Sequence, residues 1–163
     1  MVQQSDTAGV IAPPPLLALA VIGLGLLLDW LLPAYVLSLL LSLTTRIAIA
    51  AILVVAAGAL ALSAERSFRR AGTDVMPWKP TSALVTHGLY GRVRNPMYVG
   101  LGLLVAGIGI GLASDWTLVM LVAAALTIHY GVVLREERYL TAKFGEAYVR
   151  YMAAVPRYGW PSR

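Results

Sequence analysis

Two short polar stretches, each beside a long apolar run, hold the side chains of this sequence that are best suited to chemistry. The first is GLYGRVRNPMYVG at residues 88–100. It combines two arginines with Asn95, a good helix N-cap, and Pro96, which the first turn of a helix tolerates. Helix-terminal amides beside the guanidinium groups of Arg92 and Arg94 suit a carboxylate or a phosphate. The first stretch therefore predicts an anion-binding site at the start of a helix, and a solvated basic loop whose arginines snorkel to the membrane interface is the alternative.

The second stretch begins with REER at residues 135–138, directly after another apolar run. His129 and Glu136 are seven residues apart, as are Tyr130 and Glu137, so each pair shares one face of a regular helix. We expect a carboxylate at this membrane boundary to pair with an arginine of the loop at residues 65–96 or to bind a cation. A solvated helix face is the alternative for REER, and a histidine held by packing is the alternative to a substrate contact for His129.

Composition excludes several other kinds of site. The chain has no cysteine, so disulfides, cysteine nucleophiles and zinc thiolate sites are ruled out. Its two histidines, His87 and His129, lie far apart and make a poor metal-ligand set. The formal net charge is a modest +5. We predict no metal site and no nucleic-acid partner.

The elements that must position these residues are membrane helices. The 163-residue chain is 59% hydrophobic and only 13% charged, which is typical of a membrane protein with one domain, residues 1–163. A hydrocarbon core of about 30 Å needs about 20 helical residues. The uncharged runs predict four transmembrane helices, at residues 16–32, 45–64, 97–114 and 116–134.

The segments between these helices are less regular. Asp115 alone separates the last two, so we expect a tight helical hairpin. Residues 35–44 could extend the second helix, lie in the membrane interface or belong to an extra span. Loop 65–96 begins as a helix end with Gly72 as a plausible C-cap, and residues 135–154 predict an amphipathic C-terminal helix. The expected fold class is an all-α, polytopic membrane bundle of about four transmembrane helices.

The positions of the basic residues predict the orientation of the bundle. Of 13 lysines and arginines, six lie between the second and third helices and six follow the fourth. The first six are Arg66, Arg69, Arg70, Lys79, Arg92 and Arg94, and the second six are Arg135, Arg138, Lys143, Arg150, Arg157 and Arg163. By the positive-inside rule both regions and both termini are cytoplasmic, in an inner or plasma membrane. The first apolar run has no basic segment before it, so we expect a retained helix and not a cleaved signal peptide.

Glycines in the third helix allow two interpretations. Gly107 and Gly111 form a GxxxG pair, which favours close helix packing. Gly100 and Gly102 lie about one turn below the polar stretch, where a missing side chain could let a flat ligand approach the backbone.

Together, the two stretches resemble a known family. LVTHGLYGRVRNPMYVG at residues 84–100, an apolar hairpin and REERYLTAKFGEAYVRYMAAVPR at residues 135–157 resemble the isoprenylcysteine carboxyl methyltransferase family of integral-membrane enzymes. That family is similar to the phospholipid N-methyltransferases. The resemblance covers residues 65–157, and its combined motifs are specific. It implies that S-adenosylmethionine binds in a cytoplasmic pocket built from the loop, the start of the third helix and the helix leaving the fourth, with S-adenosylhomocysteine as product.

The resemblance also implies roles for particular residues. For the cofactor it implies Ala83, Leu84, Val85, Tyr90, Asn95, Pro96, Met97, Tyr98 and Glu136. Residue chemistry adds Arg92 for the cofactor carboxylate and Gly100 for close backbone approach. The candidate catalytic residues are Arg94, Asn95, Tyr98, Glu137 and His129, the last two as bases for an amine acceptor.

Two departures from the family's pattern leave the acceptor open. Asn95 stands where eukaryotic members have histidine, and Val132 stands where they have a substrate-contacting arginine. The principal prediction is a methyltransferase that acts on a prenylated or lipid-like acceptor entering from the bilayer. The alternatives are a phospholipid or amine N-methyltransferase and a non-catalytic membrane lipid-binding protein. A transporter is disfavoured because the third and fourth helices carry no internal charge, and the oligomeric state is not predicted.

Overall fold

The chain folds as a bundle of helices. Its structure, a computed structural model, describes residues 7–74, 76 and 78–159, so the predicted cytoplasmic Arg163 lies outside the described residues. The helices are α1 (Pro14–Leu31), α2 (Val36–Leu40), α3 (Leu43–Ala71), α4 (Pro96–Leu112), α5 (Asp115–Ile128), α6 (Leu134–Phe144) and α7 (Glu146–Ala154). A 3₁₀ turn, η1 (Gly88–Gly91), precedes α4, and a π-helical turn, η2 (His129–Val133), joins α5 to α6. The described residues contain no strand, which confirms the predicted all-α class.

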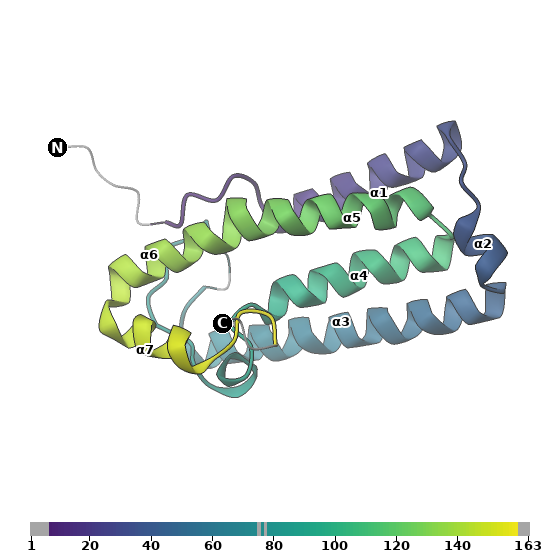
Figure 1. Cartoon of the computed structure of the whole chain (residues 1–163). Helices are drawn as coiled ribbons and strands as arrows, with labels where there is room; N and C mark the ends of the chain where they lie inside the picture. The colour runs from purple at the N-terminus through teal and green to yellow at the C-terminus, as the bar shows by residue number, and fades with distance from the viewer. Residues whose placement is uncertain (1–6, 75, 77, 160–163) are drawn as a thin grey trace.

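The helix lengths suit a membrane. Helices α1, α3 and the continuous run Asp115–Phe144 are each long and apolar enough to cross a bilayer, and α4 is a shorter apolar helix. In Figure 1 these four lie alongside one another, and the chain reverses direction at each connection. The protein is therefore an integral membrane protein.

Local sequence explains where most helices begin and end. The hydroxyl of Ser42 caps α3 by accepting from Thr45 N at 3.2 Å. Gly72 ends α3 with φ 65°, which confirms the predicted C-cap, although the helix reaches residue 71 and not 64 because no breaker precedes that glycine. The predicted helix 135–154 is two helices, because Gly145 adopts φ 55° between α6 and α7.

The predicted hairpin between α4 and α5 is confirmed. Ala113 adopts a left-handed φ of 55°, and Ser114 caps α5 by accepting from Thr117 N at 3.2 Å. Ser114 also donates to the Asp29 carboxylate of α1, and the second oxygen of Asp29 accepts from Trp116 N at 3.3 Å. We call Asp29, Ser114, Asp115, Trp116 and Thr117 the distal cluster, because it lies at the end of the bundle away from α6 and α7 (Figure 1).

The distal cluster also positions α2, within the segment 35–44 that the sequence left open. The Asp115 carboxylate accepts from Val36 N at 2.8 Å and from Leu37 N at 2.9 Å, and so caps the start of this short helix. Helix α2 lies across the distal end of the bundle (Figure 1). Its Leu39 and Leu40 are strongly exposed, as expected for a helix in the membrane interface.

Close packing depends on glycines that face a neighbouring helix. A Cβ on Gly107 would lie 3.2 Å from Ala50 O, and one on Gly111 would lie 3.1 Å from Ala50 Cβ. The GxxxG pair thus packs α4 against α3, as predicted. The tightest approach in the membrane region is at Gly25 of α1, where a Cβ would lie 2.5 Å from Thr117 Cα of α5.

Substitution of Gly25 tests this packing. We expect Gly25→Ala to lower the free energy of unfolding by about 1–3 kcal/mol, because backbone atoms of α5 must shift to admit the methyl group. The matched control is Gly23→Ala in the same helix, where an added Cβ meets nothing within 4 Å. Thermal unfolding in detergent micelles measures both variants, and equal stability of the two would contradict the assigned α1–α5 contact.

Candidate functional site

A cavity of about 510 Å³ opens at the end of the bundle opposite the distal cluster. This volume is within the usual range for a small-molecule site. Its polar part is lined by Asp74, Thr81, Tyr90, Arg94, Asn95, Tyr98, Glu136, Glu137 and Tyr139. Its apolar part continues along the helices and is lined by Pro14, Pro15, Val54, Ala57, Gly58, Ala61, Leu101 and Leu104. One cavity therefore joins a charged end to an apolar arm.

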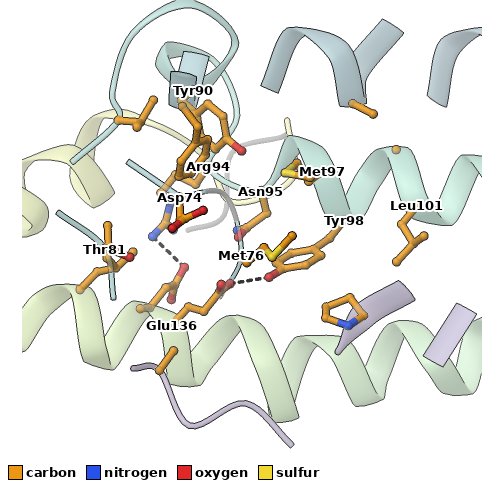
Figure 2. Close-up of a pocket in the computed structure, with 18 of the residues that line it drawn as sticks. Asp74, Met76, Thr81, Tyr90, Arg94, Asn95, Met97, Tyr98, Leu101 and Glu136 are labelled. Atoms are coloured by element: carbon orange, nitrogen blue, oxygen red, sulfur yellow. Dashed lines mark hydrogen bonds and ion pairs between the residues drawn. The ribbon is translucent and has the colours of Figure 1, made fainter. Parts of the chain in front are cut away.

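Glu136 and Tyr98 face each other across this cavity. Tyr98 lies in the first turn of α4 and Glu136 in the first turn of α6, and the Tyr98 hydroxyl donates to Glu136 Oε2 at 2.8 Å (Figure 2). Among the described residues, no lysine or arginine forms an ion pair with Glu136. With no described cation paired to it, this buried carboxyl group is open to a positively charged ligand, which would stabilise its ionised form.

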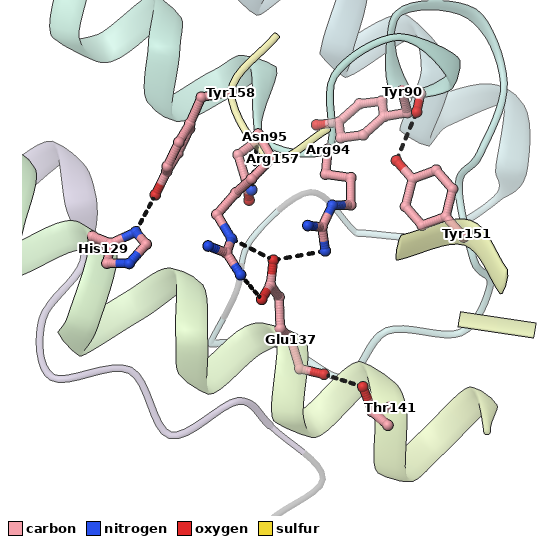
Figure 3. Close-up of polar contacts among 9 residues, drawn as sticks. All are labelled: Tyr90, Arg94, Asn95, His129, Glu137, Thr141, Tyr151, Arg157 and Tyr158. Atoms are coloured by element: carbon pink, nitrogen blue, oxygen red, sulfur yellow. Dashed lines mark hydrogen bonds and ion pairs between the residues drawn. The ribbon is translucent and has the colours of Figure 1, made fainter. Parts of the chain in front are cut away.

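Both carboxylate oxygens of the neighbouring Glu137 accept hydrogen bonds from arginines. Arg94 NH1 donates to its Oε1 at 2.8 Å, and Arg157 binds both oxygens, with Nε at 2.9 Å and NH2 at 2.7 Å (Figure 3). The side chains of Arg94 and Glu137 are only 6% and 11% exposed. Hydrogen bonding to Glu137 raises the pKa of Arg157. Arg94 Nε is buried without a hydrogen-bond partner in the part of the chain that is described.

The C-terminal residues hold the start of α4. Arg94 N donates to Pro156 O at 3.0 Å, and Asn95 N donates to Arg157 O at 3.2 Å. Asn95 Nδ2 also donates to Arg157 O, at 3.2 Å. Asn95 occupies the predicted N-cap position of α4, but its side chain makes no capping bond. The predicted N-cap position is therefore confirmed, but the Asn95 side chain binds the C-terminal segment and does not cap the helix.

Buried tyrosines join the loop before α4 to α7. Tyr151 OH donates to Tyr90 O at 2.6 Å, and Tyr90 packs edge-on against Phe68 of α3 with ring centroids 5.2 Å apart. Burial raises the pKa of Tyr90 and of Tyr151, and raises that of Tyr148 to about 12. These hydroxyls are therefore neutral at ordinary pH and serve as hydrogen-bond donors and packing groups.

The structure brings most of the predicted site residues to this cavity. Those that line it are Ala83, Leu84, Val85, Tyr90, Arg94, Asn95, Met97, Tyr98, Gly100, Glu136 and Glu137. Arg92 is exposed, and Pro96, though buried, does not line the cavity. Gly100 faces α3, since an added Cβ would lie 3.3 Å from Leu60 Cβ and 3.4 Å from Ala57 O. The missing side chain at Gly100 is therefore explained by the close packing of α4 against α3.

His129 lies outside the cavity lining and is bonded elsewhere. Its Nδ1 is 2.8 Å from Tyr158 OH (Figure 3). Its ring also packs against those of Tyr130 and Tyr158. The seven-residue spacing from Glu136 assumes a regular α-helix, but the π-helical turn His129–Val133 interrupts that periodicity. The predicted common face is therefore not maintained.

Several residues of this region have no signal in the sequence. Arg157, which neutralises Glu137, stands 20 positions after it with no helical relation to it. Asp74 and Thr81 reach the cavity from the irregular loop, and Pro14 and Pro15 reach it from the start of α1. Only the tertiary fold brings these segments together.

Comparison with known proteins identifies the family. The family model described as Phospholipid methyltransferase matches residues 45–147, from α3 to the start of α7. No curated protein and no solved structure matches the chain. The matched residues include Arg94, Tyr98, Glu136 and Glu137, and they make up more than half of the sequence. The chain therefore belongs to the phospholipid methyltransferase family.

Proposed function

We propose that this membrane methyltransferase transfers a methyl group from S-adenosylmethionine to the amine of a phospholipid headgroup. Enzymes of the family use S-adenosylmethionine, and the family implies a lipid methyl acceptor. The family match is to the phospholipid methyltransferases, whereas the similarity to the isoprenylcysteine carboxyl methyltransferases rests on the motifs alone. The phospholipid amine, an alternative in the sequence-based prediction, therefore takes precedence over a prenylated cysteine carboxylate.

The residues of the polar end fit this cofactor. The cofactor carries a cationic sulfonium and ammonium together with a carboxylate. Glu136 offers an unneutralised carboxylate to a cation, and the unpartnered Nε of buried Arg94 offers a donor to an anion. When bound, S-adenosylmethionine supplies an electrophilic methyl group. We assign Glu136, Tyr98 and Arg94 to holding it, with Ala83, Leu84, Val85, Tyr90, Asn95 and Met97 as further lining.

The apolar arm is the observation that carries the assignment of a lipid acceptor. Val54, Gly58 and Ala61 lie along one face of α3, line the arm and are exposed on the flank of the bundle. Leu101 and Leu104 of α4 line the same arm, as does the start of α1. An apolar surface at this depth is in contact with lipid. A lipid can thus place its acyl chain in the arm while its headgroup reaches Glu136.

The protein contributes chiefly positioning and exclusion of water. A headgroup ammonium must lose a proton before its nitrogen can attack. Of the predicted bases, Glu137 is held by two arginines and His129 is bonded to Tyr158, so neither is assigned this role. We assign the proton to solvent water at the loop-side end of the cavity, where exposed Asp74, paired with Lys79 at 3.2 Å, lies.

We place this end of the bundle in the cytoplasm. Loop 72–95, α6 and α7 lie together at one end in Figure 1, and they carry most of the basic residues. The positive-inside rule favours that orientation. A cysteine introduced at exposed Arg92 of this cysteine-free chain should then react with a membrane-impermeant maleimide only after the cells are opened.

Transfer of labelled methyl groups tests the proposed function. We expect purified protein with methyl-labelled S-adenosylmethionine to label phosphatidylethanolamine in vesicles and to bind S-adenosylhomocysteine in calorimetric titration. Phosphatidylcholine vesicles are the control, because their headgroup nitrogen is already fully methylated. Label only in a farnesylated cysteine acceptor would overturn the amine assignment. Folded protein that neither binds S-adenosylhomocysteine nor transfers label would overturn the enzyme assignment.

A further inference from the structure

The apolar arm has one wall that the family match does not cover. Residues 7–13, which we call the N-terminal strap, precede α1 and run beside the helix that carries Glu136 (Figure 1). Ala8 of the strap and Pro14 and Pro15 directly after it line the cavity, whereas the family match begins at residue 45. This side of the site is therefore formed by a segment outside the matched region.

The strap is attached to the π-helical turn at η2. Ile11 N donates to Gly131 O at 3.3 Å, so a carbonyl of the turn bonds outside its own helix. A Cβ on Gly131 would lie 2.3 Å from Ile11 Cδ1 and 2.8 Å from its Cγ1. The absence of a side chain at Gly131 is thus what admits the Ile11 side chain.

A second contact lies one turn further along the same helix. Arg135 NH1 donates to Gly9 O at 2.8 Å. Arg135 immediately precedes Glu136, so the strap is fixed to the same turn of α6 that supplies the carboxylate of the site. The distance between the strap and Glu136 is therefore set by short contacts.

Three consecutive prolines, at residues 13–15, connect the attached part of the strap to the cavity wall. Pro13 is extended, with φ −60° and ψ 123°, and Pro14 and Pro15 begin α1. Their rings restrict φ, so the segment between Ile11 and Pro15 has little freedom to bend. Pro14 is buried. The position of the wall is therefore determined by where Ile11 and Gly9 are attached.

We propose that the N-terminal strap is a specificity-determining wall of the acceptor site, and that its attachment at Gly131 and Arg135 holds Pro14 and Pro15 against the acyl chain of the lipid acceptor. This inference rests on the proposed function, because it presumes a lipid acceptor in the apolar arm. It assigns the strap no role in holding the cofactor, since the residues proposed for that role come from α4, α6 and the loop before α4.

A reversible cross-link tests the proposal within a single protein. Because the chain has no cysteine, the double variant Ile11→Cys/Gly131→Cys can form only its engineered disulfide, and wild type is an insensitive control for the reductant. We expect the oxidised form to retain the wild-type KM for phosphatidylethanolamine. Reduction should raise that KM roughly tenfold, the size of effect expected when one or two hydrogen-bonded or packing contacts are lost. The affinity for S-adenosylhomocysteine should stay within about twofold in both forms.

A second measurement does not depend on turnover. Phosphatidylethanolamine with a photoreactive acyl chain should cross-link to residues 8–15 in wild type and in the oxidised variant, and much less in the reduced variant. Arg135→Gln should act like reduction, whereas Arg150→Gln, on the surface of α7, should not.

Four outcomes would overturn the proposed role of the strap. An unchanged acceptor KM after reduction would show that the strap is not a wall of the site, as would adducts confined to other segments. An oxidised form that cannot use the acceptor would show that the strap must move away. A change in S-adenosylhomocysteine affinity would make the strap part of the cofactor site. Wild type that transfers no methyl group to lipid would instead contradict the proposed function itself.

Discussion

Replacement of Glu136 by glutamine is expected to weaken the binding of S-adenosylhomocysteine by roughly 10- to 100-fold, the usual size of one hydrogen bond to a charged group. The substitution preserves the shape of the side chain and can still accept from Tyr98, but it removes the negative charge. No described cation neutralises that charge in the protein, so it is available to the ammonium of the ligand. Isothermal titration calorimetry on the purified protein measures the change directly.

The control for this prediction is Glu146→Gln. Glu146 lies on α7 with its side chain 92% exposed and forms a surface pair with Arg150. We expect its loss to leave both affinity and folding unchanged. If Glu136→Gln bound S-adenosylhomocysteine as tightly as Glu146→Gln does, Glu136 would not hold the cofactor.

Loss of the adjacent carboxylate should act on stability. We expect Glu137→Gln to lower the free energy of unfolding by about 3–5 kcal/mol, because it leaves the charge of buried Arg94 without its partner. The same change removes the paired bonds from Arg157, so residues 155–159 should become more accessible to protease. Thermal unfolding and limited proteolysis in micelles measure these two effects.

A conservative variant of Arg157 is the comparison for this prediction. Arg157→Lys keeps the positive charge but loses the two-point geometry, so its stability should lie between those of wild type and Glu137→Gln. A Glu137→Gln protein as stable as wild type would show that this ion pair does not support the fold. Weaker cofactor binding at unchanged stability would place Glu137 in the site itself.

Local signals in the sequence predict much of the bundle. The C-cap at Gly72 acts within its own turn, and the GxxxG pair is a recognisable spacing for close helix packing, so both could be predicted from the sequence. Helix α2 could not be predicted, because the side chain that caps it belongs to Asp115, far along the chain. Helix α3 extends past the predicted residue 64 because no breaker precedes Gly72, whereas α4 ends at Leu112, before the predicted residue 114.

The residues of the site also divide into those with a local signal in the sequence and those that depend on distant segments. Tyr98 and Glu136 were identified through motifs, and the structure brings them into hydrogen-bond contact. The role of His129 was inferred from a regular helical period that the π-helical turn interrupts. Arg157 was missed because an ion pair between distant segments leaves no spacing pattern. Sequence placed Arg92 beside the same ligand as Arg94, but in the irregular segment between the 3₁₀ turn and α4 only the Arg94 side chain is buried, and Arg92 is exposed.

The distal cluster has a mechanical consequence for the whole bundle. Asp29 fastens one end of α1 to the start of α5, and the close contact of Gly25 with Thr117 lies next to it. A rigid-body rotation of α1 would therefore pivot near Asp29, and the displacement of its backbone would increase along the helix toward Pro14. At a rise of 1.5 Å per residue, a rotation of about 5° moves Pro14 by roughly 2 Å. The contacts of the N-terminal strap with Gly131 and Arg135 oppose such a rotation, so α1 is held at both ends and its position beside the apolar arm is fixed.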